Sequence, residues 1–156
     1  MNTRILPVGM QDFKDIRTKN YLYVDKTEYV WNLSNSSKSF FLSRPRRFGK
    51  SLFTSTLECY FRGKKDLFKG LYLYDKENAR GEDAWTEYPV ITFYLSSGEF
   101  KATDGLRDIL NNVLENVILE YDLTGSYAIT GETLPVRFRN VLMNLKKKTG
   151  QNVVVL

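Results

Sequence analysis

One segment of the chain, residues 44–51 (Arg-Pro-Arg-Arg-Phe-Gly-Lys-Ser), limits the possible folds more than any other. It lies between the apolar run Phe40-Phe41-Leu42 and a stretch with helical periodicity, so the expected order is strand, basic loop, helix. A helix N-terminus carries unpaired N–H groups and a partial positive charge, and both would face a ligand held in the loop. This order predicts a phosphate-binding loop in an α/β protein, built as a parallel sheet with flanking helices.

The loop carries the groups that bind a nucleoside triphosphate. Gly49, Lys50 and Ser51 match the end of the pattern G-x-x-x-x-G-K-[ST], whereas Arg44 stands where the pattern has its first glycine. We expect Lys50 to reach the β and γ phosphates, Ser51 to bind Mg²⁺, and Gly49 to let the backbone approach the phosphates. The simpler alternatives are a lysine at a helix start, a capping serine and a turn glycine.

The remaining loop residues are less specific. Arg44, Arg46 and Arg47 can neutralise a triphosphate, reach a partner or lie solvated, and three arginines so close together cannot all enter one phosphate site. Phe48 is expected to pack against the protein or to lie near the nucleotide base. With Pro45, these residues complete the candidate nucleotide-binding segment.

The composition excludes several kinds of chemistry. The absence of histidine rules out a His-based triad and imidazole metal ligands, and a single cysteine, Cys59, rules out an internal disulfide and a multi-cysteine zinc site. A chain of 156 residues suits one domain, and its net charge of +5 favours phosphates without singling out nucleic acid. No apolar stretch has the length of a membrane span or a signal peptide, so a cytoplasmic location is expected.

Hydrophobic periodicity predicts the other elements. Helices are expected at 11–17, after the N-cap Asp25, from Lys50 to Gly63, from Asp104 through Tyr121, and from Thr133 to Gly150. Strands are expected at 39–43, 89–95 and 153–156, with a short extended run at 21–24. The last strand, Val-Val-Val-Leu, indicates burial on both faces, as in a parallel sheet. Residues 64–87 are expected to be irregular.

Several stretches resemble the bacterial AAA-ATPase-like family. They are Leu6 to Gly9, Tyr21 to Thr27, Phe41 to Ser51, Leu67 to Leu71, Trp85 to Ile91 and Gly150 to Leu156. The resemblance implies a P-loop ATPase of the AAA-related branch that uses ATP and Mg²⁺. It also implies that residues 44–51 are the usual phosphate loop of the family, so Arg44 is a family variant. Asp25-Lys26-Thr27, a feature of that family, would then border the base pocket, the alternative to a helix cap.

The resemblance also implies what the chain lacks. In relatives, the strand that ends here at Leu156 is followed at once by acidic residues, which hold Mg²⁺ through water. A further strand then lies in the sheet between this strand and the phosphate-loop strand. We therefore expect an N-terminal portion of the domain, with an extension at 1–37 and a truncated P-loop core at 38–156. Because phosphoryl transfer needs metal, water and charge placed together, binding with little turnover is expected.

The sequence leaves three interpretations open. The first is ATP binding by part of an AAA-type ATPase. The second is a basic interaction module that binds nucleic acid or protein through Arg44, Arg46, Arg47 and the lysines at 146–148, without nucleotide. The third is a chain that does not fold stably. The expected partners are a nucleotide, a homo-oligomer, or the downstream nuclease-like domain of longer relatives, and no membrane.

Overall fold

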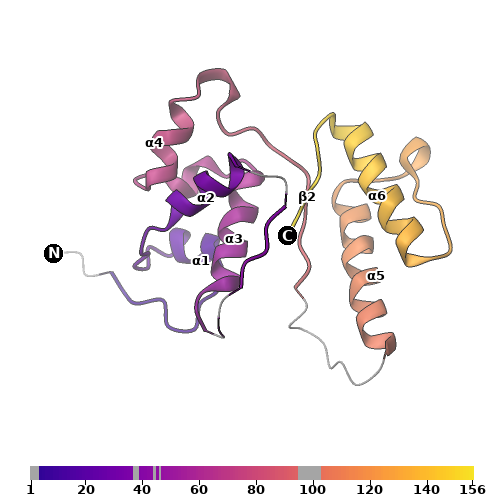
Figure 1. Ribbon diagram of the computed structural model, residues 1–156, viewed down its shortest axis with the longest axis horizontal. Coiled ribbons are helices and arrows are strands. Elements are labelled where there is room, and N and C mark those ends of the chain that lie inside the picture. Colours follow the sequence, from indigo (N-terminus) through magenta and orange to yellow (C-terminus); the bar gives the residue numbers. More distant parts are fainter. Residues whose placement is uncertain (1–3, 37–38, 44, 46, 95–102) are drawn as a thin grey trace. The chain divides into compact units, whose positions relative to one another are not determined.

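The computed structural model describes residues 4–36, 39–43, 45, 47–94 and 103–156 (Figure 1). The chain divides into two compact units, Met1–Glu87 and Tyr88–Leu156. The elements of the first unit are α1 (Phe13–Thr18), α2 (Thr27–Ser34), α3 (Lys50–Phe61), the 3-10 helix η1 (Lys65–Phe68), α4 (Tyr72–Asn78) and the 3-10 helix η2 (Gly81–Asp83). The elements of the second unit are β1 (Val90–Ile91), α5 (Thr103–Glu120), the 3-10 helix η4 (Gly125–Tyr127), α6 (Leu134–Thr149) and β2 (Val154–Val155).

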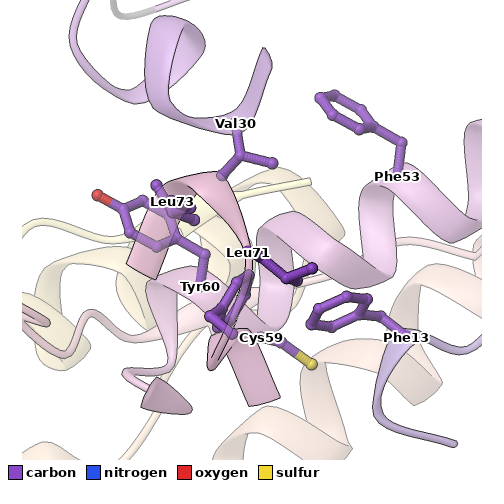
Figure 2. Packing of buried hydrophobic residues seen from close by; sticks show 8 residues of the cluster. Phe13, Val30, Phe53, Cys59, Tyr60, Leu71 and Leu73 are labelled. Atoms are coloured by element: carbon purple, nitrogen blue, oxygen red, sulfur yellow. The ribbon is translucent and has the colours of Figure 1, made fainter. Parts of the chain in front are cut away.

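The first unit is built around one apolar cluster that includes one face of α3. Its buried members are Phe13, Val30, Phe53, Cys59, Tyr60, Phe68, Leu71 and Leu73. Figure 2 shows how the side chains of Phe13, Cys59 and Leu71 approach one another in this cluster. The expected buried thiol is confirmed, and burial raises the pKa of Cys59 to about 11.

Hydrogen bonds fix the start of α1 on the side of α3. The carboxylate of Asp12 caps α1 by accepting from the N–H of Asp15 at 2.7 Å. The N–H of Phe13, the residue after Asp12, donates to Oγ of Ser55 in α3 at 3.0 Å. This bond therefore fixes the start of α1 next to Ser55 of α3.

A second connection joins α2 to α4 through Asp25. One carboxylate oxygen accepts from the N–H and the hydroxyl of Thr27 at 2.8 and 2.7 Å, and the other accepts from the N–H of Tyr72 at 2.7 Å. The hydroxyl of Thr27 accepts in turn from the N–H of Leu73 at 3.1 Å. Asp25 therefore accepts from the first N–H of both helices, but the N-cap position of α2 is Lys26, one residue later than predicted.

The second unit combines two helices with a parallel pair of strands. β1 and β2 pair with Val90 opposite Val154, and α5 packs beside α6 (Figure 1). The buried core residues are Ile91, Leu114, Val117, Leu123, Val141 and Leu145. On the edge of β1 away from β2, the N–H of Val90 donates to the hydroxyl of Tyr121 at 3.2 Å. The unit is thus of the α/β class, with a two-stranded parallel sheet.

The structure confirms the expected helices and corrects three other expectations. Residues 64–87 are not irregular, because they form η1, α4 and η2. The strand expected at 89–95 is limited to β1 within the described residues, and Leu95 lies outside them. β2 is not buried on both faces, since Val155 is 46% exposed.

Two expected extended segments also form no strand, namely 21–24 and 39–43. A strand is stable only where its N–H and C=O groups pair with a neighbouring strand, and no described strand pairs with 39–43. Its apolar side chains are accordingly exposed, up to 93% for Phe41. The division into an extension at 1–37 and a core at 38–156 stays a prediction.

Candidate functional site

The turn that leads into α3 has an unusual backbone. Arg47 and Gly49 both have left-handed conformations, with φ of 66° and 74°, and the helix begins at the next residue, Lys50. A change from left-handed to helical backbone directs successive N–H groups toward one point, which forms an anion-binding concavity. A Cβ atom at position 49 would meet no atom of the described residues within 4 Å, so glycine serves the backbone conformation here rather than a close contact.

The N-terminus of α3 is electrostatically prepared for a negative charge. Its first intrahelical bond runs from the N–H of Phe53 to the carbonyl of Gly49 at 2.9 Å, so the N–H groups before it have no acceptor within the helix. The N-cap residue, Gly49, has no side chain that could cap this end, and the first turn contains no acidic residue. The helix dipole and the exposed cations of Arg47 and Lys50 add to the positive potential.

A cleft of about 560 Å³ opens at this helix end. One wall comes from the loop and the first turn of α3: Arg47, Gly49, Lys50, Ser51 and Leu52. The opposite wall comes from the N-terminal segment: Gly9, Met10 and Gln11. That segment turns at Gly9, which has φ of 75° and lies between two short-range bonds, Val8 N–H to Leu6 carbonyl and Met10 N–H to Pro7 carbonyl.

An apolar pocket of about 210 Å³ adjoins the cleft and shares Gly49 and Leu52 with it. Leu6 and Pro7 line it from the N-terminal segment, together with residues 22–24 and one side of α3. Phe48 also lines this pocket, with 63% of its side chain exposed. A ligand with a flat apolar group next to an anionic group would match the two adjoining spaces.

The apolar pocket carries little charge. Burial raises the pKa of Tyr23, one of its lining residues, and the ring packs edge-on against Phe13 with centroids 5.0 Å apart. The phenol therefore stays neutral at physiological pH. Lys26 supplies the charge of the described pocket wall.

The structure brings together half of the residues expected to bind nucleotide. Those that line the cleft are Arg47, Gly49, Lys50 and Ser51. Phe48 lines the apolar pocket instead, and the exposed Pro45 lines neither space. Arg44 and Arg46 lie outside the described residues.

Sequence reasoning missed the opposite wall of the cleft. Leu6 to Gly9 carried the family resemblance without an assigned role, and Gln11 was interpreted as the start of a helix. No local pattern marks these residues, because the contact between Phe13 and Ser55 brings their segment to α3 from 42 positions away.

The described residues hold no group of three His, Cys, Asp or Glu side chains that would bind a metal ion on its own. Mg²⁺ in nucleotide sites takes most of its ligands from phosphate and water, with one or two from protein. The exposed hydroxyl of Ser51 in the first turn of α3 fits that arrangement.

The lysines of the alternative interaction module belong to the second unit. Lys146, Lys147 and Lys148 lie in the last turn of α6, where cations complement the helix dipole. The ammonium group of Lys148 donates to the carbonyl of Asp122 at 2.6 Å, and both Lys147 and Lys148 lie within 6 Å of the ring centre of Tyr127. Their place in the last turn supports the interpretation of the three lysines as helix-end charges.

The fold and the site together define an α/β protein. In this protein a basic loop ends at a glycine with a left-handed backbone conformation, and a helix begins at the next residue. The family described as "Predicted AAA-ATPase" matches residues 7–156, and the chain belongs to this family. The chain is similar to the "Uncharacterized protein in vnfD 5'region" of Azotobacter chroococcum mcd 1, with 34% identity over 158 residues. That match covers the whole chain but 29% of the relative, so the chain spans less than a third of its length.

No solved structure matches the chain. In the part of the chain that the structure describes, no helix is both long and apolar enough to cross a membrane.

Proposed function

We propose that the chain binds ATP together with Mg²⁺ through residues 44–51, as part of an AAA-type ATPase. The observation that carries this proposal is the pair of adjoining spaces at the start of α3. The cleft offers first-turn N–H groups and the cations of Arg47 and Lys50 to phosphates, and the apolar pocket offers a neutral surface to a base. The family match supports the same function.

Each residue has a separate role in this proposal. The ammonium group of Lys50 neutralises the β and γ phosphates, and the hydroxyl of Ser51 holds Mg²⁺. The left-handed conformation of Gly49 directs N–H groups at the phosphates. Phe48 covers the base from the rim of the apolar pocket.

Binding is proposed for this chain and hydrolysis for its longer relatives. Phosphoryl transfer requires a metal ion, an oriented water and charge stabilisation in one place. No carboxylate belongs to the described walls of the cleft. We therefore expect little turnover from these residues alone. A P-loop-like sheet, a homo-oligomer and a nuclease-like domain in longer relatives are further proposals that follow from the family resemblance. A cytoplasmic location is a separate proposal.

The test is the affinity of Mg-ATP for the chain and for Lys50→Ala, measured by calorimetry. Losing a charged phosphate ligand is expected to weaken binding by about tenfold or more. Lys64→Ala, which removes an exposed lysine outside both spaces, is the matched control and should bind normally. Unchanged affinity in a folded Lys50→Ala protein would overturn the proposal. Salt-sensitive DNA binding that resists both Mg-ATP and this substitution would favour the interaction module instead.

A further inference from the structure

We infer that the side chain of Gln11 hydrogen-bonds the terminal phosphate of bound ATP, so that the N-terminal segment lets the site distinguish ATP from ADP. This inference rests on the proposed function, because it assigns a contact within the same cleft. It concerns the wall opposite the phosphate loop, to which the loop pattern assigns no ligand.

The position of Gln11 follows from the contacts of α1. Ser51 and Ser55 are four residues apart in α3 and so lie on one face of it, one turn from each other. The N–H of Phe13 is bonded to Ser55, and Asp12 is held by capping α1. Gln11, the residue before this anchored pair, consequently faces the same cleft as Ser51.

The direction of the N-terminal segment indicates which phosphate Gln11 reaches. Along the chain, Leu6 and Pro7 line the apolar pocket, and Gly9, Met10 and Gln11 then line the cleft. A nucleotide with its base in the pocket would run in the same direction, with its phosphates along the cleft. Gln11 is the last of these wall residues before the chain returns to the apolar pocket at Ile16, and we assign it to the terminal phosphate from this order along the chain.

The chemistry of the side chain suits this contact. Among the three residues of this wall, glycine has no side chain and methionine is at most a weak acceptor, whereas the amide of Gln11 supplies two N–H donors. Gln11 is exposed, and no hydrogen bond of its side chain is found within the described residues. The amide is also neutral, so it can donate to an anion without the repulsion that a carboxylate would cause.

The experiment compares Mg-ATP and Mg-ADP affinities of the full chain by calorimetry. For Gln11→Ala we expect ATP binding to weaken about tenfold and ADP binding to change less than about twofold, as for the loss of one hydrogen bond to a charged group. Gln11→Glu should weaken ATP binding further, because it sets a negative charge against the phosphate. Gln151→Ala, at the other glutamine of the chain, is the control and should bind both nucleotides normally.

The outcomes separate this inference from the proposed function. If the unmodified chain binds neither nucleotide, both fail. If it binds ATP and Gln11→Ala binds ATP equally well, the inference fails alone. An equal loss for ATP and ADP would also overturn it, because Gln11 would then contact the inner phosphates. Thermal melting checks that each variant is folded, and Gln11→Asn, with a shorter amide, should retain part of the preference for ATP.

Discussion

At Gly49 the backbone has φ of 74°, a conformation that costs an L-amino acid about 1–2 kcal/mol. Gly49→Ala is therefore expected to lower the free energy of unfolding by about 1 kcal/mol, and also to weaken Mg-ATP binding by misdirecting the first-turn N–H groups. Gly70→Ala is a matched control, because Gly70 has φ of 76° and an equally open Cβ position away from the cleft. Chemical denaturation and calorimetry measure both effects. Equal ATP affinities in the two variants would contradict the role of Gly49.

The ionisation of Tyr60 is expected to lower the stability of the first unit at alkaline pH. Its hydroxyl donates to the buried carboxylate of Glu77 at 2.6 Å, and burial, followed by this bond, raises the pKa of Tyr60 to about 12. The phenol ionises near 10 when unfolded, so its stabilising contribution is complete below that pH and is lost as the pH rises to about 12. Denaturation between pH 9 and 12 should show this fall, and Tyr60→Phe should reduce it. An identical pH dependence in the variant would refute the assignment.

Among the elements, α2 and α4 depend on a common residue. Asp25→Ala removes the acceptor of the N–H groups of Thr27 and Tyr72, and the loss of this shared acceptor is expected to cost about 2 kcal/mol of stability. Denaturant unfolding measures the loss, with Asp83→Ala at an exposed aspartate as the control. Mg-ATP affinity of the folded variant should stay unchanged, since Asp25 lines neither the cleft nor the apolar pocket. A selective loss of affinity would instead make Asp25 a nucleotide ligand.

The same elements show why some of the fold is predictable and some is not. α3, α5 and α6 follow from apolar periodicity within each segment, which is local information. α4 was missed because the side chain that accepts from its first N–H, Asp25, lies 47 positions before Tyr72. The run at 39–43 has the composition of a strand, but a strand also requires a neighbour, which composition does not reveal.

The residues of the candidate site also include some that the sequence predicts and some that it does not. Gly49, Lys50 and Ser51 are recognisable from their spacing, because one loop and one helix turn position all three. Gln11 has no recognisable spacing relative to them, since it reaches the cleft through the packing of α1 on α3. Sequence patterns therefore identified the phosphate loop, whereas the facing wall required the tertiary structure.

At the scale of the whole molecule, the described walls of both spaces belong to the Met1–Glu87 unit. Leu73 and Leu145 are fully buried leucines of the first and second units, and replacing either with alanine is expected to cost about 2–5 kcal/mol. Near the melting temperature of the Leu73→Ala variant, this variant should lose ATP binding. The Leu145→Ala variant should retain ATP binding at the corresponding temperatures. Melting curves and calorimetry over the same temperatures test this. Parallel loss of binding in Leu145→Ala would mean that the second unit supports the site.

The burial of Cys59 has a practical consequence. Thiol reagents attack the thiolate, and a pKa of about 11 keeps that form scarce while the side chain is packed in the cluster around α3. We therefore expect modification to proceed mainly through transient opening of the first unit, so that its rate would report how often that opening occurs. A ligand that binds only the closed form lowers the rate by the factor 1 + [L]/Kd. The natural sequence, with its single thiol, thus carries a chemical reporter of ligand binding without any added label.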